Sequence, residues 1–203
     1  MREIEDSGQA MDMVRTFVAV ELPQQVKDGL TGIQQDLKRA GNDVVRWVMA
    51  EGMHLTLKFL GEIPVDMVSQ VDAALEEAAA GIPPFGLETA ELGFFPNATS
   101  PRVFWIDLKG NVPALLRLQE NVELALDALG FRREARGFSP HLTLARFRDT
   151  ALPERRQAFG EEVLHRKVPA SWAFTVDGIN LMKSTLTPGG AIYARLTKVP
   201  LRE

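Results

Sequence analysis

His54-Leu55-Thr56-Leu57 and His141-Leu142-Thr143-Leu144 are the same tetrapeptide, and 87 positions separate the two copies. In a β-strand, successive side chains point to opposite faces, so each copy directs its histidine and threonine to one side and its two leucines to the other. The leucines suit a buried face of a sheet. Two of the three histidines of the chain are therefore predicted to lie, each beside a hydroxyl group, on the open faces of two strands.

The same spacing recurs outside the two motifs. It relates Arg15 to Arg102, Phe17 to Phe104, and Phe85 to Trp172. Few other identities accompany this repeat, so it is evidence of architecture more than of sequence similarity. We predict an α+β fold with two pseudo-symmetric β-α-β lobes, whose central antiparallel sheets form a cleft. The two histidine motifs should face each other across that cleft.

Hydrophobic periodicity and turn residues place the remaining elements. Besides the strand that carries the first motif, strands are expected at residues 15–22, 44–48, 85–92, 102–106, 140–147, 172–181 and 191–199, with the turn 187–190 joining the last two. Helices are expected after Pro23 and at residues 64–80, 112–129 and 153–164. Residues 1–13 show no periodicity and are predicted to be a flexible extension, which leaves residues 14–203 as one two-lobed domain.

The composition narrows the class of protein. A chain of 203 residues with 45% hydrophobic and 25% charged residues can bury one substantial core. No apolar run approaches the length of a membrane span and no signal segment opens the chain, so we expect a cytoplasmic protein without membrane contact. The absence of cysteine excludes thiolate metal sites and cysteine nucleophiles. A net charge of -4 argues against a protein that coats long nucleic acids, but leaves small ligands and RNA ends open.

Paired histidines suit phosphate chemistry. Hydrolysis of a cyclic phosphodiester needs a base that takes a proton from water and an acid that protonates the leaving oxygen. Imidazoles, with an unperturbed pKa of about 6.5, can hold both roles near neutral pH. His54 and His141 are therefore the candidate catalytic residues, and Thr56 and Thr143 are candidates for donating hydrogen bonds to the phosphate. His165, which lies outside the pattern, is expected to be structural.

A metal site is the weaker interpretation of the same residues. A catalytic zinc ion usually has a third protein ligand, and no carboxylate accompanies either motif on the same strand face. We therefore expect neither a metal nor a cofactor.

Other parts of the chain join the two motifs in a resemblance to a known family. These parts are Arg15–Ala19, Trp47, Lys58–Glu62, Ser139-Pro140, Ser184–Leu186, Gly190 and Tyr193. From about Arg15 to its C-terminus, the chain resembles the 2′-5′ RNA ligase-like branch of the two-histidine phosphoesterases, which are RNA 2′,3′-cyclic phosphodiesterases. The resemblance implies a bilobal α+β fold and metal-independent hydrolysis of RNA 2′,3′-cyclic ends to 2′-phosphomonoesters. It also implies that His54 protonates the leaving 3′ oxygen and that His141 activates water. Some relatives join RNA ends reversibly through a 2′-5′ bond, so ligation stays open.

Two cationic side chains follow the motifs. Lys58 lies four positions after His54 and faces the cleft if the strand is regular, where it would offset phosphate charge; a solvated strand end is the alternative. Arg146 lies five positions after His141, which is the wrong parity for a regular strand, so only a bulge or the end of the strand would turn it inward. The resemblance favours a substrate-binding role for Arg146, and a structural salt bridge is the alternative.

Further basic and aromatic residues leave their roles open. Arg132, Arg133, Arg136, Arg146 and Arg148 surround the second motif, where they would suit an RNA tail or form an ordinary solvated loop. For Phe17, Trp47 and Phe138, a place in the core is favoured over base stacking.

The hypothesis of an RNA-end hydrolase has two alternatives. One is a phosphodiesterase for small cyclic-phosphate nucleotides, and the other is a non-catalytic nucleotide-binding module. Both histidine-threonine pairs are intact, which argues against the binding module. A monomer is expected.

Overall fold

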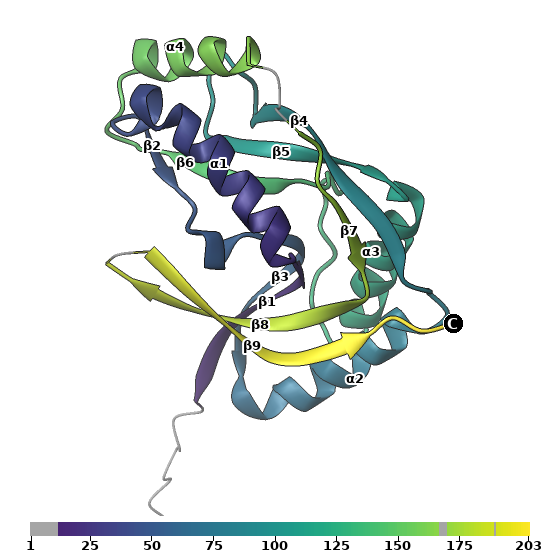
Figure 1. The fold of residues 1–203 in the computed structure, drawn as a ribbon. Helices are drawn as coiled ribbons and strands as arrows, with labels where there is room; N and C mark the ends of the chain where they lie inside the picture. The colour runs from purple at the N-terminus through teal and green to yellow at the C-terminus, as the bar shows by residue number, and fades with distance from the viewer. Residues whose placement is uncertain (1–11, 167–169, 189) are drawn as a thin grey trace, which may run out of the picture.

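The structure is a computed structural model that describes residues 12–166, 170–188 and 190–203 (Figure 1). Within these ranges the chain forms the helices α1 (Gln24–Gly41), α2 (Val68–Ala79), α3 (Val112–Asp127) and α4 (Pro153–Leu164), and the 3-10 turns η1 (Ala50–Gly52) and η2 (Val65–Met67). The strands are β1 (Met13–Glu21), β2 (Val45–Trp47), β3 (His54–Pro64), β4 (Phe85–Phe95), β5 (Val103–Gly110), β6 (Leu142–Phe147), β7 (Ala173–Val176), β8 (Gly178–Thr187) and β9 (Gly190–Pro200).

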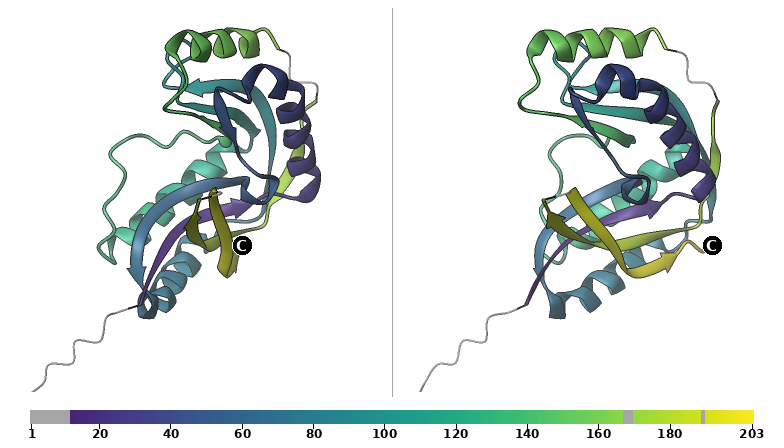
Figure 2. Two further views of the ribbon diagram at one scale, coloured as in Figure 1. Left: turned by 90° about the vertical axis from the view of Figure 1, so that its left-hand side faces the viewer. Right: turned by 60° about the vertical axis from the view of Figure 1, so that its left-hand side comes forward.

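The strands form two antiparallel sheets. One has the order β3-β1-β8-β9 and the other the order β2-β6-β5-β4-β7. Strand β3, which begins at His54, pairs with β1, the first strand of the N-terminal half of the chain. Strand β6, which begins one residue after His141, pairs with β5, the first strand of the C-terminal half. Helices α1 and α4 lie at one end of the molecule and α2 lies at the opposite end (Figure 2). The predicted bilobal α+β fold with two antiparallel sheets is confirmed.

The two halves of the chain exchange their first helices. Helix α1 packs against the sheet of the second half, where the Gln34 side chain donates hydrogen bonds to the carbonyls of Val48 and Leu144, at 2.8 and 2.9 Å. Helix α3 packs against the sheet of the first half, and Gln119 Nε2 lies 3.5 Å from the Leu57 carbonyl. Leu57 and Leu144 hold the same position in the two motifs. The two halves of the chain are therefore interlocked by equivalent contacts.

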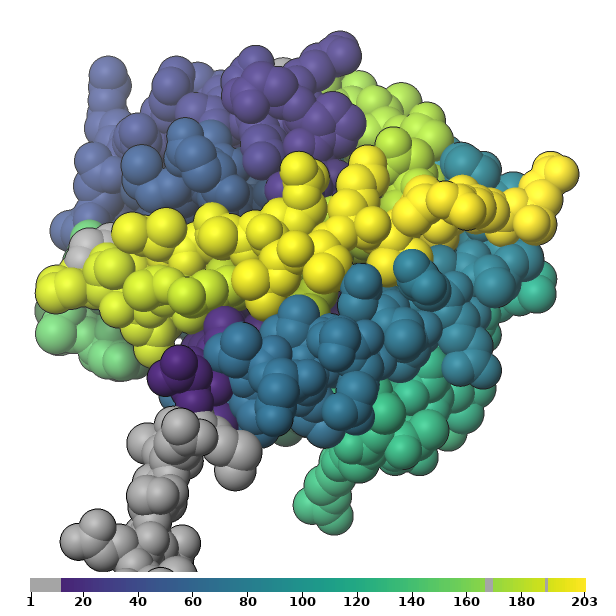
Figure 3. Space-filling view, turned by 90° about the horizontal axis from the view of Figure 1, so that it is seen from below, coloured from purple at the N-terminus to yellow at the C-terminus, as the bar shows by residue number. Residues whose placement is uncertain are grey.

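The four motif leucines lie in a core that runs through both lobes. Leu55, Leu142 and Leu144 have no exposed surface, and Leu57 is 3% exposed. At the surface, β9 and α2 lie side by side and close the four-stranded lobe from below (Figure 3). The predicted direction of the leucines is correct, so the histidines and threonines must face away from this core.

One predicted strand was wrong. Residues 172–181 do not form a single strand, because β7 pairs with β4 in the five-stranded sheet whereas β8 pairs with β1 in the four-stranded sheet. The chain changes sheets at Asp177, and Gly178 permits the close approach to β9: a Cβ there would lie 2.6 Å from the Val199 carbonyl oxygen. The segment predicted as one strand is thus divided between two sheets.

The remaining boundaries differ by small amounts. The β8–β9 hairpin is confirmed, with Thr187 opposite Gly190, although Gly189 of the predicted turn lies outside the described residues. Strand β1 begins at Met13, inside the predicted extension, of which residues 1–11 also lie outside the described part. Strand β6 begins two residues later than expected, at Leu142, since Pro140 has no N–H to donate to a ladder. No helix in the described ranges combines the length and apolar character needed to cross a membrane.

Replacing Gln34 by leucine should destabilise the fold. The substitution removes both side-chain hydrogen bonds and leaves the partly buried carbonyl of Val48 without this donor, which should lower the free energy of unfolding by about 1–3 kcal/mol. Urea unfolding measures this change. The matched control is Gln35→Leu, since Gln35 is the exposed neighbour in the same helix. Equal losses in the two variants would show that the amide of Gln34 does not hold α1 on the five-stranded sheet.

Candidate active site

A β-bulge follows each histidine-threonine pair, at the second leucine of the motif. On β3, Thr56 and Lys58 pair with the adjacent residues Ala19 and Val18 of β1, so Leu57 has no partner of its own. On β6, Thr143 and Ala145 pair with adjacent residues of β5, so Leu144 is the extra residue. An extra residue reverses which face the following side chains occupy. In both strands the two residues after the threonine are therefore buried one after the other.

The bulge turns Arg146 into the cleft. The sequence predicted that Arg146 could approach a substrate only if a bulge or the end of the strand turned it inward. The bulge is present, and the side chain of Arg146 lines the central pocket. No salt bridge joins it to another described residue. The residue 87 positions earlier, Phe59, occupies the equivalent place in β3 and also lines the pocket.

The expected orientation of Lys58 was wrong. The bulge at Leu57 gives Lys58 the parity of a core residue, and its side chain is only 1% exposed. The ammonium group points away from the cleft into a buried ion pair with Glu123, at 2.6 Å. The sequence argument assumed a regular strand at Lys58 while requiring a bulge at the equivalent place before Arg146. Lys58 is therefore not in position to touch a substrate in the pocket.

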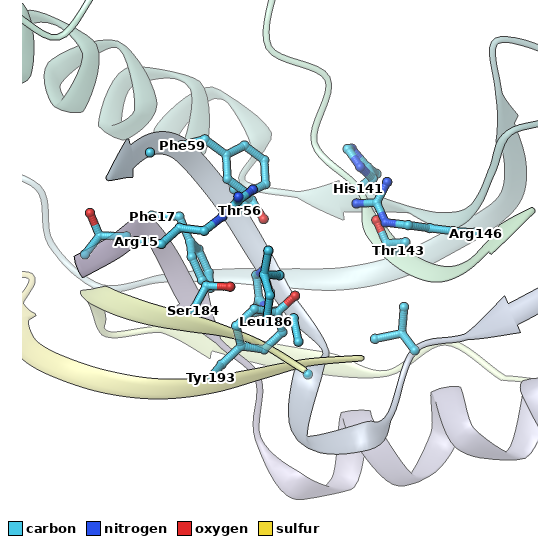
Figure 4. A pocket seen from close by; sticks show the side chains of 16 residues that line it. Arg15, Phe17, Thr56, Phe59, His141, Thr143, Arg146, Ser184, Leu186 and Tyr193 are labelled. Atoms are coloured by element: carbon cyan, nitrogen blue, oxygen red, sulfur yellow. The ribbon is translucent and has the colours of Figure 1, made fainter. Parts of the chain in front are cut away.

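The pocket lies between the two sheets and has a volume of about 480 Å³. Its lining residues are Arg15, Thr16, Phe17, Val48, Gly52, His54, Thr56, Phe59, Gly61, His141, Thr143, Arg146, Ser184, Leu186, Ala191 and Tyr193. Figure 4 shows His141, Thr143 and Arg146 facing Thr56, Phe17 and Phe59 across this space. The structure thus brings together both predicted histidines and both predicted threonines.

Each wall of the pocket carries an arginine, and one wall also presents exposed apolar groups. The wall formed by β1, β3 and the β8–β9 hairpin carries Arg15 and presents Phe59, which is 59% exposed, and Leu186, which is 66% exposed. The opposite wall carries the guanidinium of Arg146. The β8–β9 hairpin contributes Ser184, Leu186, Ala191 and Tyr193, which share one face because Ser184 pairs with Tyr193 and Leu186 with Ala191. The sequence argument missed Phe59 and the role of this hairpin face. The 87-residue spacing would have located Phe59.

Each histidine is held by the backbone two residues before it. The Nδ1 atom of His141 lies 2.8 Å from the Ser139 carbonyl oxygen, and since a carbonyl only accepts, Nδ1 carries the hydrogen. This tautomer leaves Nε2 with a free lone pair. His54 makes the corresponding hydrogen bond with the backbone of Gly52. Both nitrogens opposite these contacts are free for proton transfer.

Aromatic rings pack against both imidazoles. His54 lies between Phe17 and Tyr193, with ring centroids at 4.7 and 5.1 Å. His141 meets the edge of Phe95 at 4.9 Å. These contacts fix the rings and remove water from around them, which disfavours a charged imidazole.

Burial accordingly lowers both histidine pKa values. Desolvation is the largest cause at His54, where it lowers the pKa to about 4, and the hydrogen bond with Gly52 opposes it. Desolvation also lowers the pKa of His141, and its hydrogen bond with Ser139 opposes the shift. The positive charge of Arg146 lowers both values further. Both imidazoles are therefore neutral at pH 7 when the pocket holds no anion.

The other aromatic and basic residues that the sequence singled out lie outside the two histidine-threonine motifs. Trp47 packs edge to face on Phe104 and Phe159, and Phe138 packs against the core, as favoured from the sequence. Phe17 is both a core residue and a wall of the pocket. Of the arginines around the second motif only Arg146 lines the pocket. The side chains of the described residues contain no group of three or more potential metal ligands among His, Asp and Glu.

Two equivalent histidine-threonine motifs face one pocket between pseudo-symmetric lobes, which is the arrangement that the sequence predicts for a phosphoesterase. Comparison with known families agrees: the model described as LigT like Phosphoesterase matches the chain twice, at residues 20–105 and 106–193. The chain belongs to this family. The two consecutive matches, one to each half, support the internal duplication that the 87-residue spacing predicts.

Curated proteins and solved structures give the same result. A Thermotoga maritima protein named RNA 2′,3′-cyclic phosphodiesterase is 33% identical over 89% of this chain and 91% of its own length. One of the same name from Archaeoglobus fulgidus is 33% identical over 90% of this chain and 98% of its own. The crystal structure of TT0787 from Thermus thermophilus superposes with a TM-score of 0.74 at 29% identity, covering 93% of this chain and 98% of that one.

The free protein should keep both pocket histidines neutral at pH 7. We expect the His54 imidazole to gain a proton only near pH 4, and that of His141 below pH 6.5, because burial disfavours the charged form. Titration by ¹H–¹⁵N NMR measures both, with assignments from His54→Gln and His141→Gln. Inorganic phosphate should raise both pKa values, since a bound anion favours the imidazolium. A His54 pKa at or above 6.5 in phosphate-free buffer would contradict this account.

Proposed function

We propose that this protein hydrolyses RNA 2′,3′-cyclic phosphodiester ends to 2′-phosphomonoesters by two-histidine acid and base catalysis without a metal. The observation that carries the proposal is that His54 and Thr56 on β3 of one sheet, and His141 and Thr143 at the start of β6 of the other sheet, line one pocket. The family membership and the names of the similar curated proteins support the reaction class.

The proposed reaction is an in-line displacement at phosphorus. His141 takes a proton from water, whose oxygen forms the new bond to phosphorus. The bond between phosphorus and the 3′ oxygen breaks, and His54 gives a proton to that oxygen. The 2′ oxygen keeps the phosphate. Location on opposite walls lets the two histidines act on the attacking and leaving oxygens from opposite sides of phosphorus.

The other polar side chains of the pocket bind the phosphate in this proposal. The hydroxyl groups of Thr56 and Thr143 can donate to the two non-bridging oxygens, where negative charge increases in the transition state. Arg146 provides a fixed positive charge on the same side as His141. The anion in turn promotes uptake of the catalytic proton from solvent: by raising the histidine pKa values, the bound substrate allows the acid to be protonated near neutral pH.

The cellular setting belongs to the same proposal. We place the protein in RNA processing in the cytoplasm, acting as a monomer without a cofactor. Sedimentation analysis of the purified protein tests the oligomeric state.

The reaction is tested directly with two substrates in the presence of EDTA. One is a short RNA that ends in a 2′,3′-cyclic phosphate, and the other is a mononucleoside 2′,3′-cyclic phosphate. Chromatography against 2′- and 3′-phosphate standards identifies the product. Exclusive 2′-phosphate from the RNA supports the proposal, whereas preference for the mononucleotide would indicate a small-nucleotide phosphodiesterase. Formation of 3′-phosphate would contradict the assigned leaving group.

Replacing either pocket histidine should abolish turnover. His54→Ala and His141→Ala each remove one proton-transfer group, so kcat should fall at least ~100-fold in either variant. The measurement is the rate of RNA hydrolysis, with circular dichroism to verify folding. His165→Ala is the matched control and should keep the wild-type rate, because His165 lies outside the pocket. Folded histidine variants with near-normal rates would refute the mechanism.

Arg146 should matter for substrate affinity. Arg146→Met removes the positive charge of the β6 wall, so KM for the cyclic-phosphate RNA should rise by roughly tenfold, and the salt dependence of KM should weaken. Steady-state kinetics between low and moderate salt measure both effects. Arg117→Met removes an exposed arginine of α3 and should change neither. An unchanged KM in Arg146→Met would assign the phosphate contact elsewhere.

A further inference from the structure

Two of the segments that cross between the lobes lead directly to a histidine, the first crossing to His54 and the second crossing to His141, and they are built differently. Residues 42–53 lead from α1 to His54 and contain β2, which pairs with β6 through its backbone. Residues 128–141 lead from α3 to His141 and contain no strand. Beyond Phe131, residues 132–141 make no backbone-to-backbone hydrogen bond with any residue in the described ranges. The second crossing must be held by other means.

A buried ion pair holds the second crossing. Lys58 Nζ lies 2.6 Å from Glu123 Oε2 and also donates a 2.8 Å hydrogen bond to the Arg132 carbonyl. The same Glu123 oxygen accepts a hydrogen bond from the backbone N–H of Glu134, at 3.3 Å. Gln119 donates to the other oxygen of Glu123 at 3.1 Å. The pair thus joins β3 and α3 to two backbone groups of the crossing segment.

Stability alone does not explain this pair. Its side chains are only 1% and 5% exposed, and removing two charges from water costs about as much as their attraction returns. Two of its hydrogen bonds go to backbone groups that have no other partner in the described structure, at Arg132 and Glu134. Five residues after Glu134, the Ser139 carbonyl holds the His141 ring. The pair therefore anchors the segment that positions the second histidine.

We propose that Lys58 and Glu123 are positioning residues, which fix residues 132–140 and through them orient the His141 imidazole. They replace the strand β2 of the first crossing. Ala145 occupies the position after the second motif that corresponds to Lys58. Strand β2 pairs with β6 at Ala145, so β2 already holds the chain there and no ion pair is needed. The anchoring does not depend on the reaction; the effect on turnover rests on the proposed function.

The experiment separates anchoring from stability. Lys58→Met and Glu123→Gln each break the pair, and the double variant Lys58→Met/Glu123→Leu replaces it with apolar groups, which usually restores the stability lost by a single variant. The control is Lys109→Met, which breaks the exposed pair with Glu88. Three quantities are measured for each: the urea midpoint, the rate of native-state trypsin cleavage within residues 132–136, and kcat and KM for the cyclic-phosphate RNA. Arg132, Arg133 and Arg136 provide the cleavage sites.

In the double variant we expect a urea midpoint near that of the wild type and cleavage of residues 132–136 at least tenfold faster than in the wild type. We expect kcat to fall roughly tenfold to a hundredfold, with KM nearly unchanged, because His141 is less well oriented. Glu123→Gln keeps an acceptor and should show the same changes to a smaller extent, so it provides a folded variant. Wild-type cleavage and kcat in a folded double variant would overturn the proposal and leave the pair a purely structural element. If the wild type lacks activity, the proposed function fails, and the cleavage rates still decide the anchoring.

Discussion

Burial of the four motif leucines is the constraint on which the site depends. Complete burial of one leucine stabilises a fold by about 1.5–3 kcal/mol, and the net stability of a domain is only about 5–15 kcal/mol. A slip of β3 or β6 by one residue would expose the leucines and bury the histidines, because side chains alternate between faces. The direction of His54 and His141 is therefore set by hydrophobic burial on the other face of their strands. The reacting groups are in place before any substrate binds.

The same arrangement determines the electrostatics of the pocket. Strands that bury leucines on one face bring the histidines close to the apolar walls on the other, and Phe17, Phe95 and Tyr193 complete the exclusion of water. Desolvation then lowers both pKa values, and Arg146 adds to the effect. An anion in the pocket opposes both effects, because a nearby negative charge favours the imidazolium. The protonation state of the site is thus coupled to occupation by a phosphate.

The sequence predicted the architecture well because duplication leaves a regular signal. The spacing between the two motifs located the equivalent strands, and the alternation of leucine with histidine or threonine predicted which side chains face the cleft. The bulges at Leu57 and Leu144 could not be seen, since a bulge depends on the pairing of two strands and not on one strand alone. This is why the orientation of Lys58 was wrong. The division of residues 172–181 between two sheets escaped prediction for the same reason: periodicity shows that a strand is buried, but not which sheet it joins.

Divergence between the two halves makes the pocket chemically useful. A perfect twofold repeat would give both histidines identical surroundings and equal pKa values, whereas catalysis requires one to be protonated and the other neutral. The neighbours differ: the charge of Lys27 lowers the pKa of His54 further, while Asp107 opposes the lowering at His141. Burial is the largest cause at both rings and lowers the pKa of His54 to about 4, so a proton on His54, the proposed acid, is unfavourable in the empty pocket. A histidine of low pKa is the stronger acid once protonated, and one of higher pKa is the stronger base once neutral. The proposed assignment thus uses a minor protonation state in which protonated His54 is a strong acid, and the substrate anion increases the population of that state because it favours the imidazolium.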